Sequence, residues 1–404
     1  MQEDELRTAA PVCPLVPHVA GTSASETVLP PKCDASLDVP ALNALALRSL
    51  ALLYQPRANL FVRCAKWSAN NLHQDETSPR RTAIALLGLQ RLAEFGWPQP
   101  FDLDAVQEAL FADTSWVASV ADLGLLTWVT AALAPDKLGG LFVQFDFDRA
   151  IETYSDGQTA CTRALAWFLA GISHAQLTAA ANVPDLTDTA ANVYHLLLEN
   201  QGEGGLFGQA AFPGLLGRLC AKRIGTFSDQ IYSIYALATF ARAFQVEEPL
   251  EPALRSANSI RMLQGESGEW WALYDKRVSR VVRQYPVYSF HQGGTAPLGL
   301  RALEEATGRG FFQAIHKGLS WIAGANALQH DMRGQERGLI WDSIRVERWR
   351  PNCWETALGL LRIVRETPAS ELGICHEARP DHYGWLLYAL GEAGLPKRAG
   401  YMGP

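Results

Sequence analysis

A phrase that recurs along the chain constrains its fold more than any other feature. An amphipathic helical segment ends in glutamine, a glycine turn follows, and an aromatic residue comes next. In one copy Gln201 leads into Gly204-Gly205-Leu206-Phe207, and in another Gln264 leads into Gly268-Glu269-Trp270-Trp271. A weaker copy without the glutamine is Gly338-Leu339-Ile340-Trp341. Helix pairs that cannot bury their apolar faces alone must stack on copies of themselves, so the repetition predicts an array of helical hairpins.

Apolar residues recur at helical spacing along most of the chain. One helix is expected from Asp38 or Pro40 to Leu53. Segments rich in Ala, Gly and Leu, each beginning with a polar cluster, lie at 82–93, 120–133, 158–175, 229–244, 291–305, 353–364 and 382–393. More amphipathic helices lie between them, at 104–111, 188–200, 250–263 and 310–325.

Small-residue helices can crowd together as the inner wall of a ring, while amphipathic helices cover its outside. The predicted fold is therefore all-α, an (α/α)6 toroid of helical hairpins with short β-turn or hairpin insertions and a seventh helical segment at the C-terminus. The best candidate strand is 141–147, and a short hairpin is expected between Glu269 and Tyr288. An open right-handed solenoid is the main alternative fold.

Composition sets the predicted domain organisation and location. Residues 1–38, rich in Pro, Ser, Thr and Ala, are expected to form a poorly ordered leader, 39–396 a single toroid domain, and 397–404 a C-terminal tail. No apolar run reaches the roughly 18 residues that cross a bilayer. The seven scattered cysteines and the acidic N-terminus, which lacks a secretory signal, favour reduced thiols and a cytoplasmic location.

Charge narrows the classes of partner. The net charge of −7 and the pI of about 5.8 argue against nucleic-acid binding, which needs a basic face. Arginine-rich segments at 276–283 and 345–350 are either solvated loops or a locally basic rim that steers an anionic substrate. The oligomeric state does not follow from the chain.

The phrase Gln-x3-Gly-x-Trp at 264–270, with its Phe variant at 201–207, resembles the glutamine–tryptophan repeats of triterpene cyclases and related prenyltransferases. In those families the repeat clamps outer helices to the turns that follow. The chain is equally similar to the toroids of glucuronyl C5-epimerases, six-hairpin glycosidases and polysaccharide lyases, where a Gly-Gly-Trp turn precedes a polar segment such as 271–275. The stretch 285–297 is similar in style to their inner-helix openings. The resemblance covers most of residues 40–395.

The chain departs from some of these families. The protonating Asp-x-Asp-Asp motif of class II terpene cyclases is incomplete in the nearest strings, at 146–148 and 102–104, which lack the last acid. Protein prenyltransferases and lanthionine-forming toroids bind zinc through Cys and His. Cys353, Cys375 and His376 form the alternative zinc set, but the Gly-rich contexts of those families are missing. No metal and no cofactor is therefore predicted.

The N-terminal ends of inner helices converge on one cavity mouth in a toroid, and backbone N–H groups there favour anions. This geometry selects candidate residues near the predicted helix starts. Those expected to be catalytic are Asp156, Asp229, Tyr232, Tyr288, His291, Glu355 and Asp381. Those expected to bind substrate are Arg80, Arg81, Gln158, Gln230, Trp270, Trp271, Asp275, Gln292, His382 and Tyr383.

Each candidate also has a structural interpretation. Asp229 beside Tyr232 suits proton transfer at a sugar carbon or glycosidic oxygen, yet an aspartate there also caps its helix, which contributes about 1 kcal/mol. Tyr288 and His291 suit an opposed acid and base that invert or eliminate at C5 of a uronate. His291 equally fits a hydrogen-bonded histidine at a helix start. Most of the tryptophans are expected in the core rather than under a sugar.

The sequence therefore predicts an enzyme of carbohydrate metabolism, such as polysaccharide biosynthesis. It acts on an acidic or lipid-linked poly- or oligosaccharide by epimerase, lyase or hydrolase chemistry. One alternative is a terpenoid cyclase or prenyltransferase-like enzyme, which would have a dry, aromatic-lined cavity. The other is a non-catalytic toroid that binds a glycan or a protein.

Overall fold

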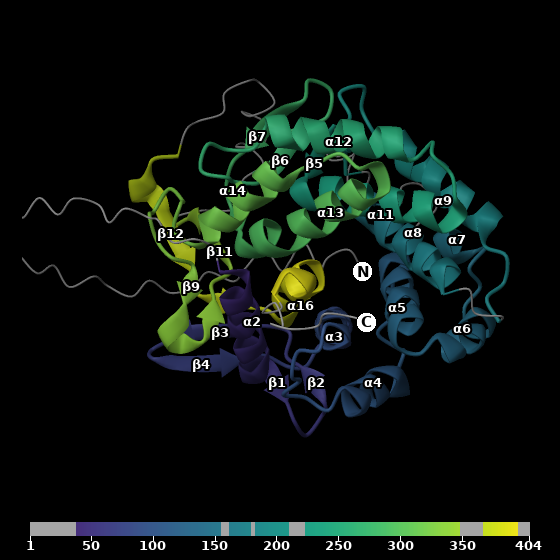
Figure 1. Cartoon of the computed structure of the whole chain (residues 1–404), viewed down its shortest axis with the longest axis horizontal. Helices are drawn as coiled ribbons and strands as arrows, with labels where there is room; N and C mark the ends of the chain where they lie inside the picture. The colour runs from purple at the N-terminus through teal and green to yellow at the C-terminus, as the bar shows by residue number, and fades with distance from the viewer. Residues whose placement is uncertain (1–37, 155–160, 179–181, 210–222, 348–366, 395–404) are drawn as a thin grey trace, which may run out of the picture.

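The computed structural model describes residues 38–154, 161–178, 182–209, 223–347 and 367–394. Helices in this part of the chain form two concentric circles (Figure 1). The predicted helical segment 353–364 lies outside the described residues, as do 1–37 and 395–404. The predicted domain boundaries therefore stay predictions.

The inner wall of the described structure consists of α3 (Pro79–Glu94), α5 (Val120–Leu133), α8 (Thr162–Leu177), α11 (Phe227–Phe244), α13 (Ala296–Thr307) and α16 (Pro380–Leu390). A π-helical turn, η2 (His291–Thr295), leads into α13. Each helix packs on the next in this order, and α16 packs back on α3. The closed circle confirms the predicted toroid and excludes an open solenoid.

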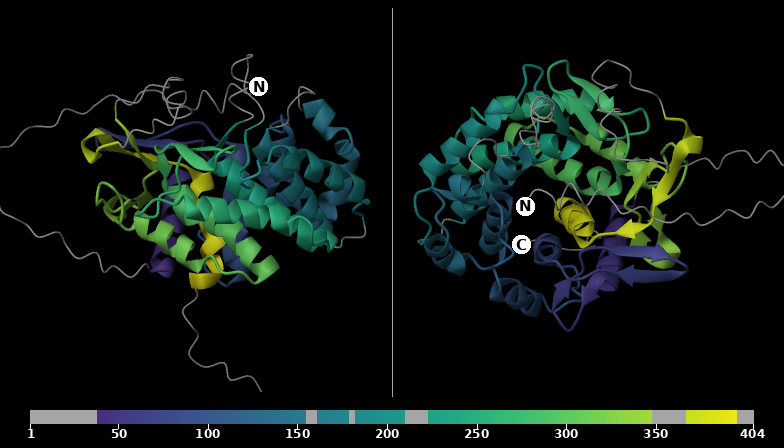
Figure 2. Two further views of the ribbon diagram at one scale, coloured as in Figure 1. Left: turned by 90° about the horizontal axis from the view of Figure 1, so that it is seen from above. Right: turned by 180° about the vertical axis from the view of Figure 1, so that it is seen from behind.

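The outer helices are α2 (Val39–Leu53), α4 (Leu103–Ala112), α6 (Leu138–Gln144), α7 (Ala150–Tyr154), α9 (Thr187–Glu199), α12 (Leu250–Met262) and α14 (Phe312–Ile322). Their amphipathic pattern determines which side packs inward. In α14, Ile315, Leu319 and Ile322 recur at helical spacing and are buried, whereas Phe312 is exposed. The first helix, α2, packs against the last, α16, so the two ends of the described chain meet (Figure 2).

Local sequence sets where the inner helices begin. The Ser78 hydroxyl accepts a hydrogen bond from the backbone of Arg81 at the start of α3, and Ser119 caps α5. Thr226 and Asp229 form a reciprocal capping box at the start of α11. The predicted starts are therefore correct to within a few residues.

Paired glycines let inner helices touch through their backbones. A Cβ atom at Gly88 of α3 would overlap the carbonyl of Gly384 in α16, and the reverse substitution would overlap the backbone of Ile84. Gly124 of α5 and Gly171 of α8 make the same kind of approach. These contacts explain the small-residue composition of the inner helices, since larger side chains would widen the circle.

The repeated glutamine phrase fastens one outer helix to the next. The Gln201 side chain donates to the carbonyl of Gly205 in its own turn and to that of Pro252 in α12, both at 2.8 Å. Gln264 makes the same pair of bonds, each at 3.0 Å, to the glycine of its own turn and to α14. Each glutamine thus joins a turn to the following outer helix, as the resemblance to glutamine–tryptophan repeats implies.

The same turns are also held from the inside of the ring. The Gln230 amide accepts from the Phe207 backbone N–H at 2.6 Å and donates to the Phe207 carbonyl at 2.8 Å. With its amide oriented to satisfy both partners, Gln292 donates to Gly268 at 2.8 Å and accepts from Trp270 at 3.1 Å. A glutamine at the start of an inner helix therefore hydrogen-bonds to the backbone of each of these two aromatic turns.

Short strands lie between outer and inner helices. They are β1 (Tyr54–Gln55), β2 (Leu60–Phe61), β3 (Ala65–Ser68), β4 (Asn71–Gln74), β5 (Ile224–Thr226), β6 (Leu273–Asp275), β7 (Arg280–Arg283), β8 (Val287–Tyr288), β9 (Arg333–Gly334), β10 (Leu339–Ile340), β11 (Ser343–Val346), β12 (Leu372–Cys375) and β13 (Glu377–Ala378). Their sheets are β1-β2, β9-β10, β8-β11-β12, β4-β3-β13 and β5-β6-β7.

Two expectations about strands have opposite outcomes. The antiparallel pair β6 and β7 confirms the hairpin expected between Glu269 and Tyr288. The strand expected at 141–147 is wrong, because 138–144 forms helix α6. Leu138 and Leu141 are buried there at helical spacing, and their burial against the ring outweighs local strand preference.

Aromatic side chains fill part of the interior of the ring. Trp128 of α5 stacks on Tyr235 of α11 at 5.0 Å between ring centroids, and lies 5.2 Å from Trp385 of α16. Tyr388 meets Trp128 edge-on at 5.5 Å. These rings lie within α5, α11 and α16, beyond the first turns of these helices.

Candidate functional site

Ion pairs at the starts of the inner helices connect neighbouring helices at one end of the ring. Arg80 Nε of α3 lies 2.5 Å from Asp122 Oδ1 of α5. Arg81 Nη1, also of α3, lies 2.6 Å from Asp381 Oδ1 of α16. Both pairs are partly buried, so charged groups from three helices are held at the end where first-turn N–H groups favour anions.

A serine and a histidine connect α11 with η2. Ser228 Oγ lies 3.2 Å from His291 Nε2, while His291 Nδ1 is buried without a hydrogen-bond partner among the described residues. Burial lowers the pKa of His291 well below its ordinary value, and the nearby charges of His382 and Arg163 act in the same direction. The imidazole is therefore neutral at pH 7, and its Nδ1 is a buried nitrogen that no described group binds.

A phenylalanine ring separates two histidines. Phe290 lies 4.2 Å from His291 and stacks on His382 at 4.1 Å, as measured between ring centroids. Burial lowers the pKa of His382 to about 4, although the charges of Asp381 and Asp342 oppose the shift. Both imidazoles are thus neutral bases at pH 7.

His382 is positioned by a buried charge network. Its Nδ1 lies 3.4 Å from Asp342 Oδ1, which also faces Arg379 Nε at 3.7 Å. Arg379 in turn binds Glu377 at 3.1 Å, and Glu377 faces Lys66 at 3.6 Å. Removing one member would leave a buried charge uncompensated, so the network fixes the start of α16.

Two carboxyl groups at this end have pKa values shifted in opposite directions. Asp229 is buried, and burial raises its pKa even though Arg163 and the hydrogen bonds from Thr226 oppose the shift. For Asp381, burial also acts upward, but the charge of Arg81 and other nearby cations lower its pKa overall. Such divergence separates an acid from a base in carboxyl-dependent enzymes.

We call the residues joined in this way the helix-start cluster: Arg81, Ser228, Asp229, His291, Asp381 and His382. Tyr288 lies beside it, with its ring 5.2 Å from that of His291. Burial raises the pKa of Tyr288 to about 12, and the charge of Asp342 adds to the effect. The phenol therefore stays protonated and can donate a hydrogen bond. The structure thus brings together several residues that the sequence predicts as catalytic or substrate-binding.

Three predicted substrate-binding residues have their polar groups occupied within the protein. Gln230 and Gln292 hold the aromatic turns described above. The Tyr383 hydroxyl donates to the Ile340 carbonyl at 2.9 Å and accepts from the Ile340 N–H at 3.2 Å. These three side chains therefore occupy equivalent structural positions on successive inner helices.

The Asp275 and Trp270 side chains are also engaged inside the protein. Asp275 is buried and binds Arg223 through both carboxylate oxygens, at 2.6 to 3.0 Å. Trp270 is buried and stacks on Phe227 at 5.2 Å. Neither side chain faces solvent, so the geometry gives both a role in packing the ring.

The other predicted aromatic residues lie apart from the helix-start cluster or deeper in the ring. Trp271 is half-buried and meets Tyr285 edge-on at 5.9 Å. Tyr232 is buried and meets Trp167 edge-on at 5.3 Å. Tyr232 lies a helical turn beyond Ser228, on the inner side of α11.

Some candidates lie outside the described residues: Asp156, Gln158, Glu355 and Cys353. Of the alternative zinc set, Cys375 is buried in β12 and His376 is exposed. Within the described ranges, no group of three His, Cys, Asp or Glu side chains is arranged to hold a metal ion.

Sequence reasoning missed the residues that support His382. Asp342 follows the third aromatic turn, at Trp341, just as Asp275 follows the second turn by a few residues. An acidic residue shortly after an aromatic turn was therefore the sequence signal that could have identified Asp342. Arg379 precedes Pro380 at the start of α16, where an arginine has no distinctive pattern. The long-range pairing of β11 with β12 brings these residues to the cluster.

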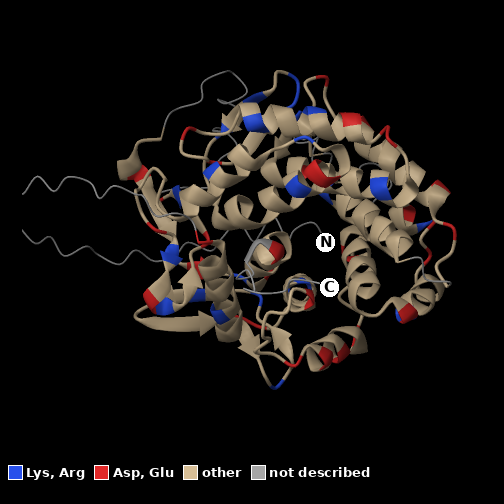
Figure 3. Ribbon diagram, in the orientation of Figure 1, with Lys and Arg blue, Asp and Glu red and all other residues tan. Residues whose placement is uncertain are grey.

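Charge and apolarity over the whole molecule agree with the composition. Acidic and basic residues are interspersed around the ring (Figure 3). Along the described ranges, no helix combines the length and apolarity that a membrane span requires.

Comparison with known proteins finds similarity at the level of the fold. No family model matches the chain, and no curated protein matches it significantly. A possible member of the GH105 family from Salmonella enterica serovar Paratyphi A matches with a TM-score of 0.58 and 13% identity, covering 93% of this chain and 99% of that chain. An unsaturated glucuronyl hydrolase specific for heparin matches with a TM-score of 0.56 and 14% identity, covering 88% and 96%.

A sugar epimerase from a ruminal bacterium also matches, with a TM-score of 0.54 and 9% identity over 88% of this chain and 100% of that chain. Identities this low establish the fold alone. The matches confirm that the chain has the predicted (α/α)6 toroid fold, which it shares with these proteins.

Proposed function

We propose that the protein is an enzyme that acts on an acidic oligosaccharide through acid–base chemistry at the helix-start cluster. The observation that carries the proposal is the opposite pKa shift of Asp229 and Asp381, which lie in the first turns of α11 and α16 at one end of the ring. The preferred reaction is hydrolysis of a glycosidic bond. Structures with the same fold include hydrolases of unsaturated glucuronyl groups, which supports an acidic sugar as substrate.

In this hydrolysis one carboxyl group would act as the general acid and the other as the general base. In its protonated form, which burial favours by raising the pKa, Asp229 donates its proton to the glycosidic oxygen as the bond from that oxygen to the anomeric carbon breaks. Ionised Asp381 accepts a proton from the water that attacks the same carbon. The acid and base are then restored by proton exchange with water.

Basic groups at the same end favour a substrate with a carboxylate. Arg81 holds Asp381, and Arg163 is close enough to Asp229 and His291 to affect the pKa of both. An arginine fork suits a carboxylate geometrically, and first-turn N–H groups add a favourable field. These features favour a uronic acid over a neutral sugar.

The test is hydrolysis of a panel of oligosaccharides that end in saturated or Δ4,5-unsaturated uronates, with neutral oligosaccharides for comparison. We expect turnover of a uronate substrate, and a decrease in kcat/KM of about 10²- to 10⁴-fold in Asp381→Asn and in Asp229→Asn. Asp331→Asn, which alters an ion pair with Arg333 away from the cluster, is the matched control. Circular dichroism and thermal unfolding establish that each variant is folded.

Folded Asp229→Asn and Asp381→Asn proteins that hydrolyse the substrate at the wild-type rate would refute this assignment. Exclusive turnover of neutral sugars would refute the acidic substrate class.

Proton transfer at a carbon atom is the second candidate, because two neutral imidazoles flank Phe290. A neutral imidazole can remove a proton from a carbon, and the protonated Tyr288 phenol beside His291 can return one to the opposite face, as epimerisation requires. A sugar epimerase is also among the proteins that share the fold. His291 and Tyr288 would then be the catalytic pair.

Incubation with uronates in D2O separates this reaction from hydrolysis. Epimerisation would incorporate deuterium at a carbon atom and leave the chain length unchanged, and His291→Gln would abolish the incorporation. Cleavage without deuterium at carbon would favour hydrolysis instead.

A further inference from the structure

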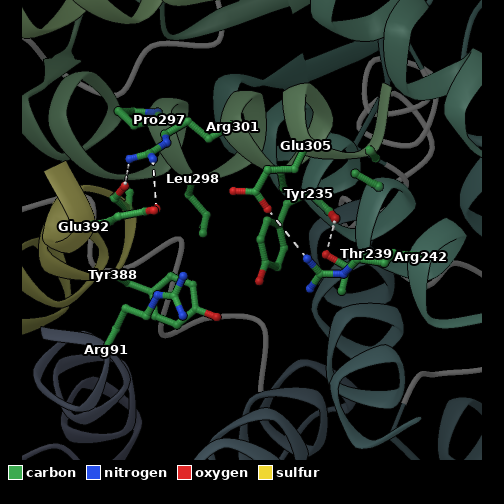
Figure 4. Close-up of a pocket in the computed structure, with 14 residues that line it drawn as sticks. Arg91, Tyr235, Thr239, Arg242, Pro297, Leu298, Arg301, Glu305, Tyr388 and Glu392 are labelled. Atoms are coloured by element: carbon green, nitrogen blue, oxygen red, sulfur yellow. Dashed lines mark hydrogen bonds and ion pairs between the residues drawn. The ribbon is translucent and has the colours of Figure 1, made fainter. Parts of the chain in front are cut away.

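A pocket of about 170 Å³ lies at the other end of the inner helices. Its walls come from the C-terminal half of α3, the C-terminal half of α11, helix α13 and the C-terminal end of α16 (Figure 4). The volume is similar to the roughly 150 Å³ cavity that holds one benzene ring in another protein. The space therefore suits a single six-membered ring.

Charged side chains on the wall form two ion pairs, one on each side of the pocket. Arg242 Nη1 lies 3.6 Å from Glu305 Oε2, and Arg301 Nη2 lies 3.3 Å from Glu392 Oε2. Figure 4 shows these pairs on opposite sides of the space. Arg242, Glu305 and Glu392 each expose more than half of the side chain, so a ligand can reach these groups from solvent.

A third arginine, which is itself paired with Glu94 at 3.1 Å, adds a guanidinium group to the wall. Arg91 of α3 lines the pocket, whereas its ion-pair partner Glu94 does not. The lining thus holds the guanidinium groups of Arg91, Arg242 and Arg301 against the carboxylates of Glu305 and Glu392. This balance suits a ligand with a single negative charge.

Tyrosines add hydroxyl groups and aromatic surface. The Tyr235 hydroxyl lies 2.7 Å from His174 Nε2, and the His174 ring stacks on Trp128 at 4.5 Å. Tyr388 lines the same pocket and packs edge-on against Trp128. Aromatic surface with fixed hydroxyls, together with paired guanidinium and carboxylate groups, is suited to the faces and hydroxyls of a sugar ring.

We propose that this pocket binds one monosaccharide acid, with its carboxylate on Arg91 and its hydroxyls on the ion pairs and tyrosines. The site is separate from the helix-start cluster and lies at the opposite end of the inner wall. Binding does not require catalysis, and only the choice of a uronate as probe rests on the proposed function.

Isothermal titration calorimetry of the full-length protein with D-glucuronate tests the proposal, with D-glucose and inorganic phosphate as comparison ligands. We expect glucuronate to bind best and Arg91→Ala to weaken its binding about tenfold or more. Arg149→Ala is the matched control, since Arg149 also pairs with a glutamate three residues later but lies outside the pocket. Ala302→Leu, which fills the pocket without removing a charge, should weaken binding as well.

Asp229→Asn tells the two ends of the ring apart, because Asp229 does not line the pocket, and it should leave unchanged the glucuronate binding event that Arg91→Ala weakens. Loss of binding in Asp229→Asn with retention in Arg91→Ala and Ala302→Leu would overturn the proposal and place the ligand at the helix-start cluster. Absence of glucuronate binding, or equal or tighter binding of glucose or phosphate, would also overturn it. An inactive enzyme that still binds glucuronate in this pocket would refute the proposed function alone.

Discussion

The Gln230 side chain satisfies both backbone polar groups of Phe207, accepting from its N–H at 2.6 Å and donating to its carbonyl at 2.8 Å. All of these groups are buried. An inner helix is thereby fastened to the turn that ends an outer helix, and Gln292 and Tyr383 repeat the arrangement farther along the chain. The repeated phrase is therefore a joint between the two circles of helices.

Replacing Gln230 by Leu should lower the free energy of unfolding by about 2–4 kcal/mol, because a buried N–H and a buried carbonyl lose their partners. Gln230→Glu should be no better, since a carboxylate cannot donate to the carbonyl. Gln313→Leu on the exposed face of α14 is the control and should have little effect. Urea unfolding measures the difference, and equal stability of Gln230→Leu and Gln313→Leu would refute the joint.

The sequence was sufficient for the ring because its determinants are local. Helical periodicity, caps such as Ser78 and paired small residues are visible without coordinates. The predicted grouping of Asp229, His291 and Asp381 at one end follows from the same reasoning, since all lie at starts of inner helices.

The structural duties of individual polar residues could not be predicted. Gln230 and Tyr383 resemble ligand-binding residues in sequence, but each faces a turn that is distant in the chain. Asp342 reaches His382 only because β11 pairs with β12. Long-range contacts of this kind decide whether a polar group at a helix start remains available to a substrate.

The approach of α3 to α16 makes a second prediction. Gly88→Ala should destabilise the protein by several kcal/mol, roughly 2–4, because its Cβ would overlap the backbone of Gly384 and force the helices apart. Gly140→Ala in α6 meets no atom within 4 Å and should instead stabilise by about 0.5–1 kcal/mol, as alanine does in a helix. Opposite shifts in the urea midpoint are expected, and a neutral Gly88→Ala would contradict the close packing.

Acid should weaken the fold through His174. Burial lowers the pKa of His174 to about 3, with the charges of Arg242 and Arg91 acting in the same direction. In the unfolded chain the imidazole takes up its proton near pH 6.5, so between pH 6.5 and 3 the unfolded state binds more protons than the folded state. The free energy of unfolding therefore decreases as the pH is lowered from about 6.5 to about 3. The contribution reaches at most about 5 kcal/mol.

His174→Gln keeps a polar group facing the Tyr235 hydroxyl but cannot titrate. Urea unfolding at a series of pH values should show a shallower decline for the variant than for wild type between pH 6.5 and 3. Parallel curves would mean that His174 is protonated as easily in the folded protein as in the unfolded chain.

Substitution of Asp275 tests whether this residue has a structural role or binds substrate. Its carboxylate binds Arg223 at 2.6 to 3.0 Å, faces Arg280 at 3.8 Å, and accepts from the Arg277 backbone N–H at 3.1 Å. It also lies in β6 between β5 and β7, which pair with it on either side. Asp275→Asn leaves Arg223 without its counter-charge and should cost about 3–5 kcal/mol.

A kinetic comparison distinguishes the two duties of Asp275. If the residue only holds the sheet beside α11, Asp275→Asn should unfold at lower urea, yet the folded protein should retain the wild-type KM for whichever uronate substrate is turned over. Asp331→Asn, an exposed acid paired with Arg333, should change neither quantity appreciably. A raised KM at unchanged stability would instead assign Asp275 to substrate binding, because a side chain that holds no structural partner can be removed without weakening the fold.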